Sequence, residues 1–178
     1  MPSSISHALA GLAVGAWSRP SAPSRRVLVF AAVCAAMPDI DVLSWAFHTP
    51  NSSFWSHRAF THSLVFAMMA GACATWIGFR GAAWEGRRLR IAAVLALATA
   101  THGLLDACTS YASGVELFAP FTKHRYRFPI PPFGTPMHTV AGQLAQELCF
   151  VTVPLLALLA LAWWRRRRAM RTATERSG

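Results

Sequence analysis

Long apolar runs separated by short polar segments dominate this sequence. Five apolar stretches can be read, at residues 5–17, 27–47, 61–79, 91–108 and 144–164. A helix needs about 20 residues to cross a bilayer core about 30 Å thick. The third and fifth stretches meet that length, the second and fourth meet it when their polar ends are included, and the first reaches only part way. The pattern predicts an all-α fold, a polytopic transmembrane bundle of about four to five helices.

Two prolines interrupt the apolar stretches. Pro38 lies inside the second stretch and Pro154 inside the fifth. Proline removes a backbone N–H group and disfavours a continuous helix, so we expect a turn or a kink at Pro38. A membrane bundle tolerates such breaks, because neighbouring helices can satisfy the freed carbonyl groups.

Composition and charge agree with a membrane protein. Hydrophobic residues make up 54% of the 178 residues and charged residues only 13%, whereas an average soluble domain has about 25% charged residues. The net charge of +10 would favour nucleic-acid binding in a soluble protein. Here the arginines lie at the ends of apolar stretches, so membrane topology explains them better and no nucleic-acid partner is expected.

The arginines also predict an orientation. Most basic residues lie in the segments 18–26, 80–90 and 165–178, and the remaining four are Arg58, Lys123, Arg125 and Arg127. By the positive-inside rule those three segments face the cytoplasm and the N-terminus lies outside. We therefore expect one membrane-embedded domain over residues 1–165 and a basic cytoplasmic tail over residues 166–178.

Each apolar stretch carries potential metal ligands at the end that faces away from the arginine-rich segments. In chain order these residues are His7, Asp39, Asp41, His57, His62, His102, Asp106 and Glu147. Ionisable residues are costly inside a membrane and usually mark a function. The pattern therefore predicts a polar His/Asp cluster near one membrane face.

The segment "THGLLDA" holds the most informative pair. His102 and Asp106 are four residues apart, so on a helix they share one face. An imidazole and a carboxylate placed in this way can bind one ion or two neighbouring ions. A histidine–aspartate hydrogen bond that satisfies both side chains inside the bundle is an equally open reading.

Two further segments and one single histidine give weaker evidence of a metal site when each is considered alone. "MPDIDVL" holds Asp39 and Asp41. Both carboxylates could bind a metal, or one could be a ligand and the other a base. Alternatively, one aspartate could cap a helix while the other is solvated. "SHRAFTHSL" holds His57 and His62 beside Arg58, whose guanidinium suits a phosphate or carboxylate, and Thr61 could cap the third helix. A polar entry loop whose arginine meets lipid headgroups is also open. His7 lies on an apolar helix, where a histidine is more often a satisfied core residue.

Together these residues support a metal-site hypothesis. The candidate ligands are His7, Asp39, Asp41, His57, His62, His102 and Asp106. Imidazole and carboxylate ligands suit zinc, manganese or iron, and zinc is the favoured ion here. Asp41 or Glu147 could act as general base, and Arg58 could position an anionic group.

In this order the segments resemble a known family. "SHALAGLAVG", "MPDIDVL", "SHRAFTHSL", "THGLLDA" and "APFTKHRYRFP" are similar to the membrane-bound metal-dependent hydrolases related to YdjM, a family named after LexA-regulated bacterial inner-membrane proteins. The resemblance covers roughly residues 3 to 165. It implies a bacterial inner-membrane hydrolase with a divalent metal cofactor.

A weaker resemblance concerns the order of the ligands. Zinc-dependent phospholipase C also places a histidine, an aspartate, a histidine and a His-x3-Asp pair in this order, but it adds a later His-x3-Glu pair. Here His124 and His138 are followed four residues later by Phe128 and Gly142, so one or two ions are expected rather than three.

The function that follows is hydrolysis of a phosphoester, such as a phospholipid, by metal-activated water. The basic loop residues Lys123, His124, Arg125 and Arg127 could hold an anionic lipid or phosphoester, or could simply extend towards the membrane interface. The alternative is a non-enzymatic membrane protein with a structural or transport metal site. The expected partner is the lipid bilayer, and no protein partner can be inferred.

Overall fold

Helices make up nearly all the regular structure of the protein. The computed structural model describes residues 2–18, 24–50, 53–109, 113–128 and 139–175. Within these residues the backbone pairing of Val115 with Tyr126 is an isolated bridge outside the helices. The predicted all-α fold is confirmed.

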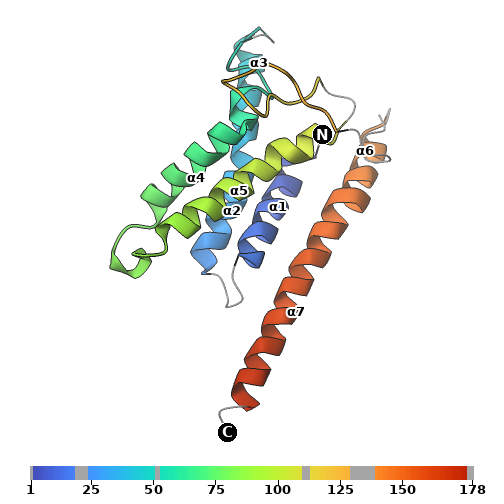
Figure 1. The fold of residues 1–178 in the computed structure, drawn as a ribbon. Coiled ribbons are helices and arrows are strands. Elements are labelled where there is room, and N and C mark those ends of the chain that lie inside the picture. Colours follow the sequence, from blue (N-terminus) through green and yellow to red (C-terminus); the bar gives the residue numbers. More distant parts are fainter. Residues whose placement is uncertain (1, 19–23, 51–52, 110–112, 129–138, 176–178) are drawn as a thin grey trace.

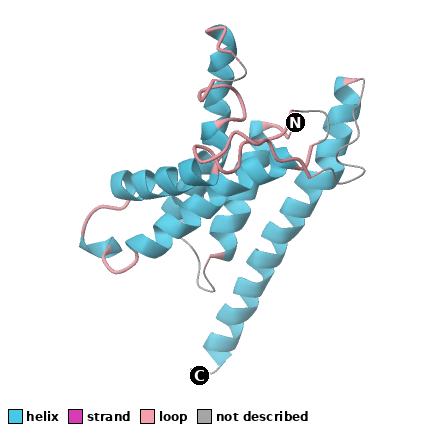
Figure 2. Ribbon diagram, turned by 45° about the horizontal axis from the view of Figure 1, so that its top comes forward, coloured by secondary structure: helices cyan, strands magenta, loops and turns pink. Residues whose placement is uncertain are grey.

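Four helices form an antiparallel bundle, and a fifth long helix lies beside it (Figure 1). The bundle consists of α1 (Ser4–Trp17), α2 (Arg25–Ala36), α4 (Leu64–Gly78) and α5 (Arg88–Ala107), and the long helix is α7 (Val153–Glu175). The helix α5 contacts α1, α2 and α4, whereas α7 contacts α1. Figure 2 shows the same arrangement after a 45° turn. The expectation of four to five helices is confirmed.

Short helical segments connect these five helices. They are η1 (Met37–Val42), α3 (Leu43–Ala46), η2 (Phe60–His62), η3 (Ala82–Trp84), α6 (Val140–Glu147) and the π-helical segment η4 (Leu148–Thr152). The segments η1, α3 and η2 lie together at one end of the bundle, which is the end that holds the candidate ligands.

Hydroxyl side chains fix where three of the apolar helices begin. Ser3, Ser24 and Ser63 accept hydrogen bonds from the backbone N–H groups of Ser6, Val27 and Phe66, at the starts of α1, α2 and α4. Such caps satisfy N–H groups that have no partner within the helix. The third apolar helix is therefore capped by Ser63 and not by Thr61.

The helices differ from the apolar stretches in length. Helical runs at Arg25–Ala46, Arg88–Ala107 and Val140–Thr172 are long and apolar enough to cross a membrane, whereas α1 and α4 are shorter. The third stretch was expected to span, but residues 60–63 form a 3₁₀ turn and a cap, which leaves 15 residues for α4. The first stretch is short, as expected.

Both prolines occur where the regular α-helix is broken. The helix α2 ends at Ala36, and Pro38 opens the 3₁₀ segment η1, so the predicted turn at this position is confirmed. Pro154 is the second residue of α7, which begins where the π-helical segment η4 ends. Because Pro154 has no N–H to donate to the preceding turn, a change in helical register there is expected.

Small residues allow the helices to pack closely. A Cβ atom added at Gly11 would lie 2.2 Å from the carbonyl oxygen of Ala31, and one added at Gly71 would lie 2.5 Å from the backbone nitrogen of Ala96. The pairs α1–α2 and α4–α5 are thus in backbone contact. Small residues are the usual means of close packing in membrane bundles, where helices gain little from the hydrophobic effect.

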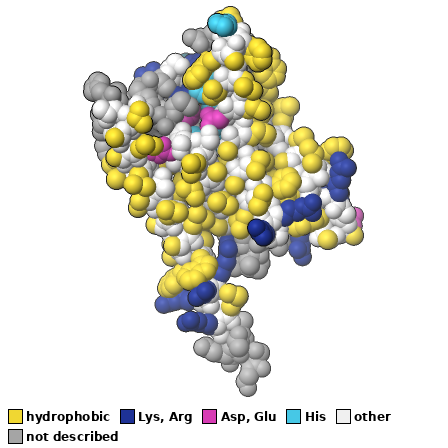
Figure 3. Space-filling model, turned by 180° about the vertical axis from the view of Figure 1, so that it is seen from behind, with side chains coloured by type: hydrophobic (Ala, Val, Ile, Leu, Met, Phe, Trp, Pro, Cys, Tyr) yellow, Lys and Arg dark blue, Asp and Glu magenta, His cyan; other side chains and the backbone are white. Residues whose placement is uncertain are grey.

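The outer surface has an apolar middle and an arginine-rich end (Figure 3). Large apolar side chains such as Val33 and Trp76 are more than half exposed on the helices, as expected of a lipid-facing surface. Arginines stack on tryptophans at the arginine-rich end, with the guanidinium carbon of Arg80 4.2 Å from the Trp76 ring centre and that of Arg168 3.8 Å from the Trp164 ring centre. Tryptophan and arginine typically mark a membrane interface.

Candidate metal centre

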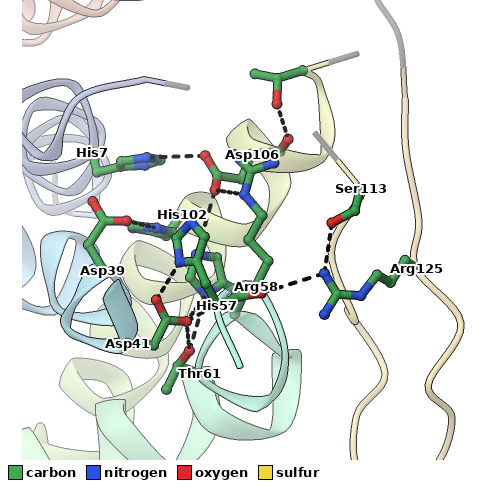
Figure 4. A network of polar contacts seen from close by, with 12 residues as sticks. His7, Asp39, Asp41, His57, Arg58, Thr61, His102, Asp106, Ser113 and Arg125 are labelled. Atoms are coloured by element: carbon green, nitrogen blue, oxygen red, sulfur yellow. Dashed lines mark hydrogen bonds and ion pairs between the residues drawn. The ribbon is translucent and has the colours of Figure 1, made fainter. Parts of the chain in front are cut away.

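Seven predicted ligands converge at the end of the bundle that lies opposite its arginine-rich end (Figure 4). We call them the His/Asp cluster, and they are His7 of α1, Asp39 and Asp41 of η1, His57 of the following loop, His62 of η2, and His102 and Asp106 of α5. Five segments of the chain therefore contribute to one site. His7, His102 and Asp106 are completely buried, and Asp39 is the most exposed carboxylate, with 15% of its side chain accessible.

The pair on α5 forms the centre of the cluster. The Nδ1 atom of His102 is 2.7 Å from the carbonyl oxygen of Ala35, which directs Nε2 towards Asp39 Oδ1 at 3.3 Å. The ring of His7 stacks on the ring of His102 with centroids 3.6 Å apart, and His7 Nε2 lies 3.5 Å from Asp106 Oδ1. A backbone contact that fixes one imidazole nitrogen and leaves the other free is typical of metal-binding histidines.

The two aspartates of η1 face different neighbours. Asp39 lies beside His102 and accepts a hydrogen bond from Ser4 Oγ at 2.8 Å. Asp41 contacts Nδ1 of His57 at 2.6 Å and Nδ1 of His62 at 3.0 Å. The break at Pro38 ends α2 one turn before the ligands, so both carboxylates can point into the bundle end.

Asp41 orients the two histidines of the "SHRAFTHSL" loop. It also accepts hydrogen bonds from Thr61 Oγ1 at 2.5 Å and from the backbone N–H of Arg58 at 3.2 Å. Contact through Nδ1 leaves Nε2 of both histidines without a hydrogen-bond partner. This carboxylate–histidine arrangement commonly presents Nε2 to a metal.

Gly103 allows the loop to reach α5. A Cβ atom at Gly103 would lie 2.4 Å from the carbonyl oxygen of His62, which is much closer than atoms can approach. The absent side chain lets His62 lie between His102 and Asp106, with His62 Nε2 3.6 Å from Asp106 Oδ2. Gly103 was not among the predicted site residues, although it lies inside "THGLLDA".

Arg58 is the one cation buried directly against the cluster among the described residues. Its Nε atom is 3.0 Å from Asp106 Oδ2, its side chain is 3% exposed, and neither Nη1 nor Nη2 has a hydrogen-bond partner. The residue adopts a left-handed conformation with φ of 68°, which is unfavourable for a side chain of this size. Strain of this kind is often found at functional sites.

Three overlapping groups of ligand atoms are close enough to hold an ion. Each is a set of atoms within 4.8 Å of one another, and the sets are His7, His102 and Asp106; Asp39, His62 and His102; and Asp41, His57 and His62. Several nitrogen–oxygen separations are 3.3 to 3.6 Å, which is longer than a good hydrogen bond. Two ligand atoms about 2.0–2.2 Å from one tetrahedral zinc ion lie roughly this far apart. The residues fit a divalent metal.

The electrostatics at His62 favour positive charge. Burial alone would lower the pKa of His62, but its contacts with the carboxylates of Asp106 and Asp41 outweigh burial and raise the pKa above its usual value. Two carboxylates therefore stabilise a cation placed between them, whether it is an imidazolium or a metal ion.

Glu147 lies beside the cluster and not inside it. Its Oε1 atom accepts hydrogen bonds from the backbone N–H of Ser3 at 2.6 Å, from Ser6 Oγ at 2.5 Å and from Ser3 Oγ. These contacts join the start of α1 to the end of α6, one turn away from His7. The general-base role of Glu147 stays a prediction, and its structural role was not foreseen.

The predicted basic loop has an internal role for one of its members. Arg125 binds Glu116 Oε1 at 3.2 Å and donates to Ser113 Oγ at 2.9 Å and Ser56 Oγ at 3.3 Å. It thus holds residues 113–128 against the loop that carries His57. Its partners Glu116 and Ser56 were not predicted, and His138 lies outside the described residues.

Comparisons with known proteins identify sequence relatives of this chain. The family described as YdjM inner membrane protein matches residues 1–169. The inner membrane protein YbcI of Escherichia coli (strain K12) is 31% identical over 175 residues, which cover 94% of this chain and all of the relative. No solved structure matches.

Proposed function

Because the chain belongs to the YdjM family of inner membrane proteins, we propose that it is a membrane-embedded hydrolase that cleaves a phosphoester with the help of a divalent metal, preferably zinc. The predicted family and the inner-membrane location are confirmed. The proposal concerns the activity, the metal and the roles of the residues.

One observation carries the proposal. Apart from Ser44, the buried side-chain nitrogens and oxygens that lack a hydrogen-bond partner in the described part of the chain all belong to the His/Asp cluster or to Arg58. Several of these atoms, such as Asp106 Oδ2, have a charged neighbour but no hydrogen bond, and others, such as Nη1 and Nη2 of Arg58, have neither. A buried polar group with no partner costs about 1–3 kcal/mol. A site with this many unpaired atoms in one place is built for a charged ligand.

The donor set indicates which ligands fit. Imidazole nitrogens together with carboxylate oxygens suit zinc, manganese or iron. Each group of potential ligands contains three residues, which leaves a position for water or substrate on a four-coordinate ion. When bound, one or two such ions would polarise a phosphoryl group and lower the pKa of a coordinated water.

Residues of the chain would bind the substrate, position the metal ligands and accept a proton. Nη1 and Nη2 of Arg58 would bind two oxygens of the phosphoester, a geometry in which a guanidinium is strong. Asp41 would hold His57 and His62 in place. Asp41, if it is not itself a ligand, or Glu147 would accept the proton of the attacking water.

The decisive experiment measures metal and activity in the same samples. The full chain is purified in detergent, its bound metal is quantified, and hydrolysis of a soluble chromogenic phosphodiester is followed. We expect stoichiometric metal and measurable turnover, with both lost in His102→Ala and Asp106→Ala. Met68→Ala on the exposed surface of α4 is the control. Absence of metal from the wild type, with no effect of either cluster variant, would refute the proposal.

We also propose that the cluster faces the outside and the tail after residue 165 faces the cytoplasm. The arginine-rich ends of α2, α5 and α7 support this orientation. A periplasmic reporter fused after Gly114 should be active and one fused after Gly81 inactive. The opposite pattern would invert the orientation.

A further inference from the structure

An apolar groove lies between α1, α5 and α7. It has a volume of about 600 Å³ and is lined by Ala10, Ala13 and Val14 of α1, by one face of α5 between Val94 and Cys108, and by Leu155 and Leu158 of α7. We propose that this groove holds one hydrocarbon chain of a membrane lipid whose phosphate group lies at the His/Asp cluster. The inference rests on the proposed function and names its substrate as a phospholipid rather than a soluble phosphoester.

The wall of the groove can recognise only hydrocarbon. The side-chain hydroxyls of Thr101 and Ser18 both donate to carbonyl groups of their own helices, at 2.7 Å to Ala98 and at 2.8 Å to Gly15. Because both hydroxyl hydrogens are already used, neither residue can donate a hydrogen bond to a polar ligand in the groove. Because α5 and α7 are long apolar helices, the medium around the groove is lipid.

The groove is long enough to hold one hydrocarbon chain of a lipid. The lining of α5 runs from Val94 to beyond Leu105, a rise of about 17 Å at 1.5 Å per residue. That exceeds half of a bilayer core of about 30 Å, which is the depth reached by one lipid chain.

The groove leads to the cluster along α1. His7, Ala10 and Val14 follow at intervals of three and four residues, so they share one face of the helix. The groove therefore runs along the same face directly below His7. On α5 the lining residues Thr101 and Leu105 immediately precede His102 and Asp106 in sequence.

Hydrogen bonds between α1 and the α7 region mark both ends of the groove. At the cluster end, the hydroxyls of Ser6 and Thr152 are 3.3 Å apart. At the other end, Trp17 Nε1 donates to the carbonyl oxygen of Leu158 at 3.1 Å. These contacts hold α7 beside α1 while the small side chains of Ala10 and Ala13 leave room between the helices.

Charge complementarity favours one orientation of the bound lipid, with its phosphate group at the His/Asp cluster. At one end of the groove, Nη1 and Nη2 of Arg58 lie in the cluster without a hydrogen-bond partner. At the other end, Arg90 and Arg166 donate to the carbonyl oxygens of Ser18 and Ala16, and Arg165 stacks on Trp17, so each of these arginines already has a partner. A molecule with an anionic head and a hydrocarbon tail satisfies both parts of the site at once.

Photolabelling tests the groove without relying on turnover. The full-length protein in detergent is mixed with increasing amounts of a phosphatidylglycerol that carries a diazirine in one acyl chain, irradiated and analysed by mass spectrometry. We expect saturable labelling of the groove residues of α1, α5 and α7. Ala13→Phe, which fills the groove, and Leu104→Trp, which lies at its partly exposed edge, should each reduce that labelling several-fold. Met68→Trp on the exposed face of α4 is the matched control.

Two outcomes would overturn the groove assignment. One is labelling of the groove that rises without saturation, like that of the exposed face of α4, and the other is unchanged labelling in both filled variants.

Measurements of hydrolysis distinguish failure of the groove assignment from failure of the proposed hydrolase function. Loss of activity on the long-chain lipid with retained activity on a soluble phosphodiester in Ala13→Phe supports both. Saturable labelling without hydrolysis of either substrate refutes the proposed function and leaves the groove as a lipid-binding site.

Discussion

At the scale of single residues, the cluster depends on buried side chains that keep some nitrogen or oxygen atoms without a hydrogen-bond partner. Arg58 is the clearest case, since its guanidinium is buried, its Nε contacts Asp106 and its backbone adopts a left-handed conformation. Such a residue is costly for the fold, and a ligand that pairs with both terminal nitrogens offsets that cost.

Replacing Arg58 tests this role. Lysine keeps the charge but cannot bind two oxygens in one plane, so Arg58→Lys should lower kcat/KM for a phosphodiester by roughly 10- to 100-fold, and Arg58→Gln by more. Bound metal per folded chain should change little in Arg58→Lys. Steady-state kinetics and metal analysis of the same preparations provide the check. Full activity in Arg58→Gln would exclude an anion-binding role.

Gly103 makes a second prediction at this scale. A methyl group there meets the carbonyl oxygen of His62, so Gly103→Ala should push the loop away and destabilise the protein by roughly 1–3 kcal/mol. Metal affinity should fall as well, because His62 moves. Gly71→Ala is the matched control: it disturbs the α4–α5 contact but lies away from the cluster, so metal per folded chain should be retained. Equal metal affinity in both variants would contradict this account.

At the scale of elements, separate segments carry the ligands and separate contacts hold those segments together. The breaks at Pro38 and after η2 turn the chain back towards α5, and Glu147 ties the end of α6 to the start of α1. Local patterns predicted the helices, the break at Pro38 and the end of each helix that carries ligands. They could not predict that residues 60–63 form a turn or that Asp41 orients two histidines, because both depend on contacts between distant segments.

The contact of Glu147 with α1 can be separated from a catalytic role. Glu147→Ala removes the acceptor of the Ser3 and Ser6 hydrogen bonds, and it should cost about 1–3 kcal/mol of stability since these groups are partly buried. We expect thermal unfolding in detergent to shift to lower temperature, with a double-mutant cycle against Ser6→Ala showing coupling. A Glu147→Gln variant that keeps its stability and its metal but loses all turnover would instead support the predicted general base.

At the scale of the whole molecule, the fold has one arginine-rich end, an apolar middle and one polar end. The apolar pattern and the arginines predicted this division, because each is a direct consequence of the surrounding medium. The groove beside α7 was not predictable in the same way. It arises where Ala10 and Ala13 leave space that Leu155 and Leu158 do not fill, which only the packing of three helices reveals.

The five segments that supply ligands make metal binding a property of the whole bundle. An ion held by α1, η1, η2 and α5 binds the folded protein and not the unfolded chain, so it should stabilise the fold by about 2.7 kcal/mol when free metal is 100 times its dissociation constant. A chelator should therefore lower the midpoint of thermal unfolding, and added zinc should restore it. In His102→Ala the midpoint should not respond to either addition, whereas Met68→Ala should behave as the wild type. A wild-type midpoint that does not change with chelator or zinc would show that the cluster is satisfied without a metal, with Nε2 of His7 and Nε2 of His102 paired only with carboxylates.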